Sequence, residues 1–323
     1  MEFSTLSMTE IVRLQGLLQQ ELTRRFERPH ALAFSDIVGS TAYFARFGDA
    51  AGRQLQQLHL DILQHSVAAH RGRIVDTAGD GAFLAFADAN GAAQAMIDLE
   101  TGLSMANLSH ARERQLQVRI GIHHGSVLTD GVVVSGDAVN LCARVAASAA
   151  TGEIRLTREA FQELDMAQRL NCRPLPQTAL KGVARPVELL SLEWRDHSVF
   201  PTQVRIEETG EQIELPLQDI IGFGRLREHE GRLVNDVVLR PPDPAHARLI
   251  GRWHFELRRG PDGFRLRQVS DSATEVDGTP VAKGHEVRVG PGARIRVAHL
   301  LTVALSSPRR AMPEDLAATR LTG

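Results

Sequence analysis

The chain has 323 residues, of which 43% are apolar and 24% charged, so it is a globular protein long enough for two domains. Its net charge of −2 gives no reason to expect nucleic-acid binding. No apolar run approaches the ~18 residues of a membrane span, and the first residues lack the basic and apolar regions of a secretory signal. Cys142 and Cys172 are too few for a disulfide framework and indicate buried thiols in a reducing compartment. We therefore expect a cytoplasmic location, with no membrane span and no nucleic-acid partner.

The N-terminal segment, residues 1–29, is predicted to be a helix over 7–27. Ser7 and Glu10 have the spacing of a capping box, and Pro29 is expected to end the helix. One apolar stripe follows the helical period, through Ile11, Leu14, Leu18, Leu22 and Phe26. Such a stripe suits a helix that packs on its own domain or one that forms a dimer, and the sequence leaves both open.

Residues 30–195 alternate strand and helix patterns. The predicted elements are a strand at 31–36, helices at 40–47 and 50–70 with Gly72 as the C-cap, a hairpin at 73–86, a helix at 88–112, a strand at 117–123, a short β region up to Val134, a helix at 136–149, a strand at 153–156, a short helix capped by Thr157 and a strand pair over 180–192. This order, β-α-β-β-α-β with an added αβ unit, predicts a ferredoxin-like α+β fold with its helices on one face of the sheet.

Two carboxylates occupy special positions in this pattern. Asp36 ends the first strand, just before a Gly-Ser-Thr helix start, and Asp80 lies in the hairpin turn between Gly79 and Gly81. If the two strands are neighbours in one sheet, both carboxylates meet at its end. Carboxylates with backbone N–H groups nearby suit a hard divalent cation and the phosphates that it carries.

From about residue 199 the pattern changes to short strands separated by frequent Gly, Pro and Asp turns. This spacing is typical of an all-β sandwich, which we predict over residues 200–306. Residues 307–323 carry no periodicity and are expected to form a flexible tail.

Residues 31–192 resemble the class III nucleotidyl cyclase catalytic domain. Four segments in the right order carry the resemblance: Phe34-Ser-Asp-Ile-Val-Gly-Ser-Thr41, Gly79-Asp80-Gly81, Gly136-Asp-Ala-Val-Asn-Leu-Cys-Ala-Arg144 and Leu180-Lys181-Gly182. The resemblance implies an enzyme that converts a nucleoside triphosphate to its 3′,5′-cyclic monophosphate and pyrophosphate.

The family's functional residues carry over to these segments. Asp36 and Asp80, with the carbonyl of Ile37, are implied to hold two divalent cations, Mg²⁺ or Mn²⁺. Phosphate binding is implied for the turn that contains Gly39, Ser40 and Thr41.

Three further residues are implied to act on the substrate from the later segments. Asn140 orients the ribose, Arg144 meets charge on the α-phosphoryl group, and Lys181 contacts the outer phosphates. In this family one protomer supplies the aspartates and the other the Asn and Arg, so the resemblance implies a head-to-tail homodimer.

The base-reading positions depart from the adenylyl cyclase pattern. Asp76 stands where those enzymes carry Lys, and Val133 where they carry Asp or Thr. An ionised carboxylate only accepts hydrogen bonds, so Asp76 favours a base with a ring N–H, guanine or uracil. We expect a base other than adenine and slightly favour uridine over guanosine, because the short Asp76 carboxylate and the apolar Val133 look more like a reduced base-reading set than a guanine site. Similar bacterial cyclases that make cyclic UMP or cyclic CMP serve antiphage defence. Tyr43 and Phe44 either narrow this pocket or pack in the core.

Other readings remain open. The chain fits a guanylyl or atypical adenylyl cyclase of ordinary signalling, or a catalytically silent cyclase-like nucleotide sensor. His123 and His124 are not expected to chelate a metal, because adjacent residues of a strand point to opposite faces.

Residues 200–306 resemble a forkhead-associated domain, a sandwich that reads phosphothreonine. The matching segments are Ile221-Gly-Phe-Gly-Arg225, Gly251-Arg252-Trp253-His254 and Ser272-Ala-Thr-Glu-Val-Asp277-Gly278-Thr279. Gly251 replaces the phosphate-binding Ser and Asp277 replaces the Asn, which leaves Arg225 and Arg252 as phosphate contacts. His254 is expected to be structural. We therefore favour a docking or regulatory module that binds a protein partner without phosphate dependence.

Overall fold

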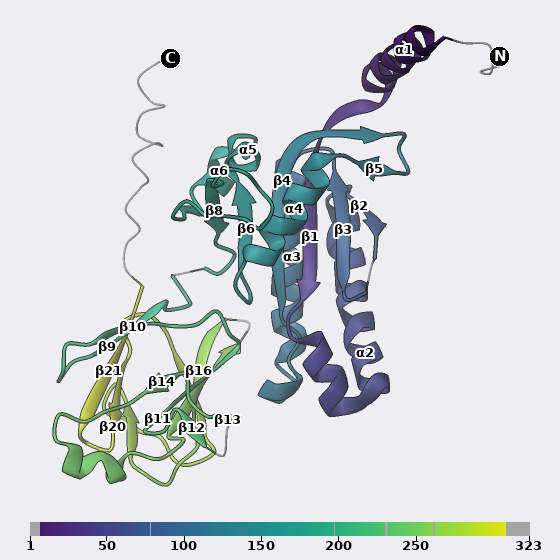
Figure 1. Cartoon of the computed structure of the whole chain (residues 1–323). Coiled ribbons are helices and arrows are strands. Elements are labelled where there is room, and N and C mark those ends of the chain that lie inside the picture. Colours follow the sequence, from purple (N-terminus) through teal and green to yellow (C-terminus); the bar gives the residue numbers. More distant parts are fainter. Residues whose placement is uncertain (1–6, 78, 197, 230–231, 261, 308–323) are drawn as a thin grey trace, which may run out of the picture. The chain divides into compact units, whose positions relative to one another are not determined.

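The computed structural model describes residues 7–307 except 78, 197, 230–231 and 261, and it divides into two compact units (Figure 1). Unit 1 comprises Met1–Glu100 and Leu116–Glu193, and unit 2 comprises Thr101–Gln115 and Trp194–Gly323. The predictions for residues 1–6 and for the tail beyond residue 307 lie outside the described residues. Within those residues no helix is both long and apolar enough to cross a bilayer.

Unit 1 is built on one mixed sheet with the order β2-β3-β1-β4-β6-β8-β7. The strands are β1 Glu27–Ile37, β2 Arg73–Asp76, β3 Gly81–Phe86, β4 Val118–Thr129, β6 Ile154–Thr157, β7 Cys172–Pro174 and β8 Leu189–Leu192, and β5 Val134–Ser135 pairs with β4. The run β2-β3-β1-β4 is antiparallel throughout, which is the strand arrangement of the predicted βαββαβ fold. This part of the fold prediction is confirmed.

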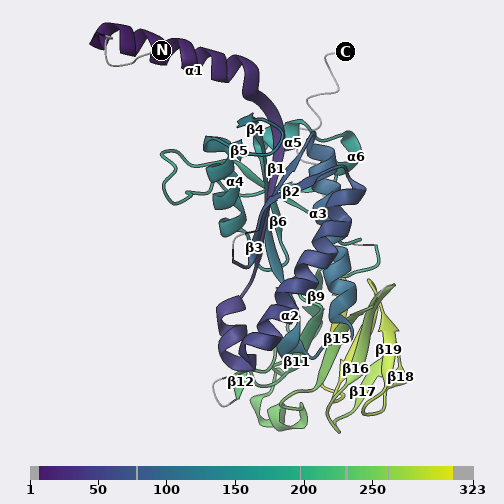
Figure 2. The same ribbon diagram turned by 90° about the vertical axis from the view of Figure 1, so that its right-hand side faces the viewer.

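Helices cover both sides of this sheet, so the expectation of helices on one face was wrong (Figure 2). Helices α2 Ser40–Ala69 and α3 Ala89–Asn107 cover one face, and α4 Asp137–Ser148 covers the other. The physical reason lies in β1, where Ala31, Leu32 and Ala33 are all fully buried although successive side chains point to opposite faces. Two apolar faces need two layers of helix.

The first helix, α1 Met8–Phe26, begins with the predicted capping box between Ser7 and Glu10. The chain then enters β1 at once, so Pro29 does not end the helix as expected. Pro29 lies within β1, opposite Ser126 of β4. It is tolerated because β3 joins β1 only from Ala31 onward, which leaves the other side of Pro29 without a ladder partner.

Gly48 within α2 and Gly72 just after this helix have different roles. Gly48, with φ +82°, separates the two predicted helical stretches that form α2. Gly72 is not the C-cap, because the left-handed residue there is Arg71, with φ +54°. A Cβ on Gly72 would lie 2.2 Å from the Phe86 ring, so this glycine permits close packing instead.

Two further boundaries differ from the sequence prediction. Helix α3 stops at Asn107, where residue 112 was expected, and a short 3₁₀ turn follows at Arg112–Arg114. Leu180 lies outside any strand, since the final strand pair is β7 and β8. Two short helices lie between β6 and β7: α5 Arg158–Gln162, capped by Thr157 as expected, and α6 Met166–Arg169.

Unit 2 contains two β-sheets that share one apolar core, as the sandwich prediction requires. One sheet orders β10 Gln212–Glu214, β9 Gln203–Ile206, β21 Leu301–Ser306, β20 Arg294–Val297, β17 Thr274–Val276 and β18 Thr279–Pro280; the other orders β14 Val237–Val238, β11 Ile220–Gly224, β15 Phe255–Gly260, β16 Gly263–Gln268 and β19 Glu286–Val289. A small hairpin pairs β12 Glu228–His229 with β13 Arg232–Leu233. The core includes the stacked rings of Phe223 and Phe255.

Unit 2 also includes the segment Thr101–Gln115, which lies inside the predicted catalytic stretch. The buried carboxylate of Asp219 accepts hydrogen bonds from the Ser104 hydroxyl at 2.5 Å and from the Asn107 amide at 2.9 Å. Arg112 forms an ion pair with Asp236 at 2.6 Å. These contacts bind the end of α3 and the residues after it to the sandwich.

Candidate active site

Asp36 and Asp80 lie next to each other at one end of the unit 1 sheet. Asp36 is the penultimate residue of β1, and its register partner on β3 is Gly81, the residue after Asp80. Ile37, whose carbonyl was implied in metal binding, follows with a buried side chain. The strand neighbourhood that the sequence argument required is therefore present.

An arginine from β4 holds the first of these carboxylates. The Arg119 guanidinium donates to Oδ2 of Asp36 through Nε at 2.8 Å and Nη2 at 2.5 Å. Asp36 and Arg119 are register partners across β1 and β4. Sequence analysis missed Arg119, because its role appears only once the strands are paired.

The second carboxylate is held by the start of α2. The Ser40 hydroxyl donates to Asp80, and Gly39 before it adopts φ +72° at the helix N-cap. The Gln56 amide donates to the Gly79 carbonyl at 3.2 Å, which fixes the hairpin turn. Of the predicted phosphate-binding residues, Ser40 thus contacts a predicted metal ligand, and Thr41 follows in the first turn of the helix.

The donor set at this end of the sheet fits a divalent cation that arrives with a substrate. Two carboxylates and a hydroxyl are the hard oxygen donors that Mg²⁺ and Mn²⁺ prefer. Among the described residues no group of three or more His, Cys, Asp and Glu side chains could enclose a metal by itself. Water and phosphate oxygens would complete the coordination, as is usual for Mg²⁺.

A buried histidine lies beneath Asp80. His59 of α2 is 4% exposed, and its Nε2 is 2.9 Å from the Ser35 hydroxyl. Burial lowers the pKa of His59 to about 4, although the Asp80 carboxylate acts in the opposite direction. The imidazole is therefore neutral at pH 7. Its sequence signal was a histidine at helical spacing between Leu55 and Leu63, on the buried stripe of α2.

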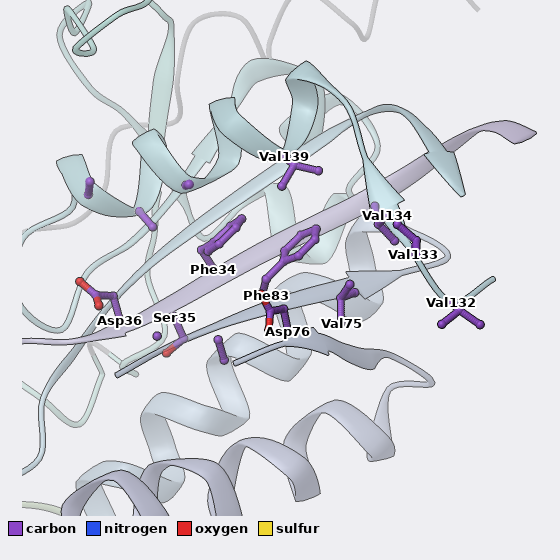
Figure 3. Close-up of a pocket in the computed structure, with 15 residues that line it drawn as sticks. Phe34, Ser35, Asp36, Val75, Asp76, Phe83, Val132, Val133, Val134 and Val139 are labelled. Atoms are coloured by element: carbon purple, nitrogen blue, oxygen red, sulfur yellow. The ribbon is translucent and has the colours of Figure 1, made fainter. Parts of the chain in front are cut away.

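A cavity of about 670 Å³ extends from Asp36 along the α4 side of the sheet (Figure 3). Asp36 lies at one end of the labelled residues and Val132 at the other, with Asp76 between them. The two predicted base-reading residues, Asp76 and Val133, both line this cavity. The rings of Phe34 and Phe83 stack on its floor at 4.7 Å.

Tyr43 and Phe44 do not line this cavity. Tyr43 packs on Phe47 with ring centroids 4.7 Å apart. The Phe44 ring lies where a side chain on Gly52 would fall, within 2.5 Å of an added Cβ. Both contacts match the packing alternative for these two residues.

Asn140, Arg144 and Lys181 form a separate group. Arg144 Nη1 donates to the Gly182 carbonyl at 2.7 Å, next to the exposed Lys181, and Asn140 is exposed one turn earlier on α4. None of the three lines the cavity described above; α4 contributes Val139, Ala143, Ala146 and Ala147 instead. A single chain therefore holds the predicted site residues as two groups.

The two adjacent histidines of β4 are not a metal site among the described residues. Nδ1 of His123 is 2.9 Å from the Thr157 hydroxyl in the interior, and burial lowers the pKa of this imidazole.

In unit 2, a backbone hydrogen bond connects the loops that carry Arg225 and Arg252. The Arg225 N–H donates to the Gly251 carbonyl at 3.0 Å. A Cβ on Gly251 would lie 2.7 Å from Cβ of Ser270, so the missing serine has no room there. His254 is buried and structural, accepting from the Gly251 N–H at 3.0 Å.

Asp277 has a local backbone role. It adopts φ +50°, and its carboxylate accepts from the Arg294 N–H at 2.8 Å. An acceptor engaged in this way offers no donor to a phosphate.

Comparison with known proteins places unit 1 in a family. Residues 26–192 match the adenylate and guanylate cyclase catalytic domain, which is just over half of the chain. The chain therefore belongs to this family, the class III nucleotidyl cyclases.

Individual relatives share only part of the chain. A Rhizobium meliloti (strain 1021) protein named "Putative adenylate cyclase 3" is 23% identical over 190 residues, covering 59% of this chain and 32% of that protein. The Caenorhabditis elegans receptor-type guanylate cyclase gcy-6 is 27% identical over 167 residues, covering 47% and 15%. This chain thus spans about a third or less of these curated relatives. A solved adenylate/guanylate cyclase/hydrolase from Silicibacter pomeroyi is 24% identical, covers 51% of this chain and 96% of that one, and has a TM-score of 0.47.

Proposed function

We propose that the protein is a nucleotidyl cyclase that converts a nucleoside triphosphate to its 3′,5′-cyclic monophosphate and pyrophosphate. The observation that carries the proposal is Asp36 at one end of a cavity of about 670 Å³ that also contains Asp76, with Asp80 directly before Gly81, the register partner of Asp36. Two carboxylates beside a nucleotide-sized cavity suit a metal-bound triphosphate whose base lies farther along.

The carboxylates bind two divalent cations, Mg²⁺ or Mn²⁺, with the Ile37 carbonyl. The cations supply charge that lowers the pKa of the ribose 3′-hydroxyl and neutralises the leaving pyrophosphate. Asp36 and Asp80 orient these charges, with Arg119 and Ser40 fixing the two carboxylates. The Gly39–Thr41 turn lies beside them and offers backbone N–H groups to the triphosphate.

The remaining groups come from a second copy of the chain in a head-to-tail homodimer. Asn140 and Arg144 lie outside the cavity of their own chain, which supports a site completed by a partner. The partner's α4 would bring the amide to the ribose and the guanidinium to charge on the α-phosphoryl group. Lys181, beside Arg144 at Gly182, would meet the outer phosphates.

Base selection rests on Asp76 and Val133. As an acceptor, Asp76 pairs with a ring N–H and leaves the ring acceptor of adenine without a donor, at a cost of about 1–3 kcal/mol. Uracil and guanine both present such an N–H. We favour uridine over guanosine because Val133 offers no second polar partner for the larger base. Cyclic UMP would be the product, in the manner of an antiphage second messenger.

The test is mass spectrometry of the products after purified protein is incubated separately with ATP, GTP, CTP and UTP and Mn²⁺. We expect a cyclic nucleotide and pyrophosphate from UTP, and none from the Asp36→Asn variant. Asp49→Asn, an exposed carboxylate of α2, is the matched control and should keep the activity.

Other outcomes decide between the alternatives. Cyclic GMP would identify Asp76 as a guanine reader and ordinary signalling as the context. Cyclic AMP would refute the base argument. No product from any nucleotide would refute the enzyme proposal and leave a nucleotide sensor, whose output would pass through unit 2.

For unit 2 we propose a docking or regulatory role with a protein partner. The blocked serine position at Gly251 and the engaged carboxylate of Asp277 both argue against dependence on a phosphate group. Arg225 and Arg252 remain as the charged groups on the joined loops.

A further inference from the structure

The loop between β4 and β5 carries two valines that are exposed to solvent and also line the cavity. Val132 is 74% exposed and Val133 is 59% exposed, although both line the cavity that contains Asp76. Large apolar side chains held in water cost free energy unless a ligand or partner covers them. Because these two valines line a cavity, a ligand that fills the cavity can cover them.

The backbone of these valines is held from one side by Asp130. Its Oδ1 accepts hydrogen bonds from the N–H groups of both Val132 and Val133, each at 2.9 Å. Gly131 allows the turn, with φ +95°. The two backbone hydrogen bonds, with a smaller effect of Arg73, hold the pKa of Asp130 below its usual range, so this group is a carboxylate at neutral pH.

The same backbone is held from the other side by Arg73 of β2. Its Nη1 donates to the Val132 carbonyl at 2.8 Å. In the sheet β2 and β4 are separated by β3 and β1, which corresponds to about 14 Å at the usual strand spacing of ~4.8 Å. The loop therefore arches over the sheet to reach Arg73, and this contact holds the backbone of Val132, which lines the cavity.

A β-bulge in β2 aligns Arg73 with Asp76. Arg73 pairs with Ala85 and Asp76 with Phe83, with the register shift between Ile74 and Asp76. Residues three apart on a regular strand point to opposite faces, but the extra residue places Arg73 and Asp76 on one face, that of Phe83. Strand β2 thus carries both Asp76, the predicted base reader, and Arg73, which holds the valine loop on the opposite side of the cavity.

The hydrogen bond from Arg73 is not easily replaced. Its Nη2 is buried and has no hydrogen-bond partner among the described residues. A guanidinium in that position depends on the Val132 carbonyl and on the charge of Asp130 to offset its desolvation.

We propose that Arg73 and Asp130 are positioning residues for base selection. Their hydrogen bonds hold the backbone of Val132 and Val133 from opposite sides and set the distance between Asp76 and Val133. We call this pair of residues the clamp. This inference rests on the proposed function, since it assumes that a nucleobase fills the cavity. The ring N–H of the base meets Asp76 while the exposed valines pack on the base. Without these hydrogen bonds Val132 and Val133 move away from Asp76. Bases that differ in size and in their hydrogen-bonding edge then bind with more similar affinity.

The test compares Arg73→Ala, Arg73→Lys and Asp130→Ala with the wild type in steady-state kinetics on all four nucleoside triphosphates. We expect Arg73→Ala and Asp130→Ala to raise KM for the preferred substrate about tenfold with kcat within about twofold, and to lower the selectivity for its base by a similar factor. Arg73→Lys keeps a donor and should recover part of the selectivity. The matched control is Arg173→Ala, an exposed arginine on β7 at the opposite edge of the same sheet, which should leave both parameters unchanged.

Three results would overturn the inference. The first is an equal loss of kcat/KM for every nucleotide with selectivity retained. The second is a lowered melting temperature as the sole effect of Arg73→Ala. The third is a change of oligomeric state in sedimentation, which would make the valines a protein interface.

Failure of the proposed function is separable from failure of this inference. If the wild type turns over none of the four nucleotides, equilibrium binding of the four methylanthraniloyl nucleotides measures base selectivity directly. Selective binding that Arg73→Ala abolishes would support the clamp without catalysis, and absent or unselective binding by the wild type would refute it.

Discussion

At the scale of single residues, Asp36, the carboxylate proposed to bind a metal, is paired with the guanidinium of Arg119. Both contacts from Arg119 fall on Oδ2 of Asp36. The pair is partly exposed, with side-chain exposures of 38% and 30%, so it contributes little to folding stability. Its main effect is therefore on the charge that a divalent cation meets at Asp36.

This pairing predicts stronger metal binding when the arginine is removed. Arg119→Gln should lower the Kd for Mn²⁺ several-fold, because the cation no longer competes with a guanidinium for Asp36. Electron paramagnetic resonance of free Mn²⁺ measures this directly, with Arg119→Lys as the charge-preserving control. Weaker binding in Arg119→Gln would mean that orientation of the carboxylate outweighs its neutralisation.

Sequence reasoning singled out candidate site residues that a local pattern marks, and it missed the arginines that contact them through strand pairing. Asp36 and Asp80 stood out because one ends a strand and the other lies in a glycine turn. Arg119 and Arg73 carried no comparable signal. Their partners lie 83 and 59 positions away in the chain, and the contacts exist only through the pairing of β1 with β4 and the arching β4–β5 loop.

At the scale of elements, the position of α4 depends on a glycine in the strand beneath it. A Cβ on Gly121 of β4 would lie 2.2 Å from the backbone nitrogen of Ala146. This close approach brings α4 onto the sheet, where Ala146 and Ala147 line the cavity.

Gly121→Ala is therefore expected to destabilise unit 1. Overpacking of this kind costs about 1–3 kcal/mol, because the clash is with backbone that cannot rotate away. Gly16→Ala in α1 is the matched control: an added Cβ there meets nothing within 4 Å, and alanine favours the helix. Chemical denaturation followed by circular dichroism should show a lower midpoint for Gly121→Ala alone. An unchanged midpoint would show that α4 is free to shift.

The elements themselves were largely predictable, since apolar periodicity and capping residues act locally. Ser7, Thr157 and the glycine hairpin each gave the expected local structure. The errors arose where tertiary packing decided the outcome. Pro29 was expected to end a helix, but it lies in a strand and has no ladder partner on one side. Gly72 was expected to cap a helix, but its lack of a side chain leaves room for the Phe86 ring.

At the scale of the whole molecule, the separation of Asp36 from Arg144 makes a prediction about assembly. Asp36→Asn and Arg144→Ala should each be inactive, yet a mixture of the two should regain activity. In a head-to-tail dimer each mixed pair has one site with both halves intact, so an equimolar mixture should reach about a quarter of wild-type activity. Pyrophosphate release measures this. Two inactive variants that stay inactive after co-expression would contradict a shared site.

Both units should also lose stability in acid. Burial lowers the pKa of His59 and of His254 to about 4, against about 6.5 in the unfolded chain. The unfolded state binds more protons below pH 6.5, so each histidine favours unfolding as the pH falls from about 6.5 to 4, by about 3 kcal/mol at most. Above pH 6.5 neither has an effect.

The two units can be followed separately in this experiment. Trp194 and Trp253, the two tryptophans of the sequence, both belong to unit 2, so their fluorescence follows that unit. The long helices α1 and α2, which lie wholly in unit 1, dominate a circular dichroism signal. His59→Gln should flatten the pH dependence of the circular dichroism transition only. A change in the fluorescence transition would contradict this assignment.

The segment Thr101–Gln115 affects how the protein can be divided by proteolysis and how its domains can be exchanged by gene recombination. The backbone passes between the units three times, after residues 100, 115 and 193. After a single protease cleavage near residue 193, Ser104, Asn107 and Arg112 remain on the N-terminal fragment, although they satisfy two acidic side chains of the sandwich. The second unit is not a cassette that recombination can append or remove at one junction. Any exchange that keeps it folded must also carry fifteen residues from the middle of the cyclase reading frame.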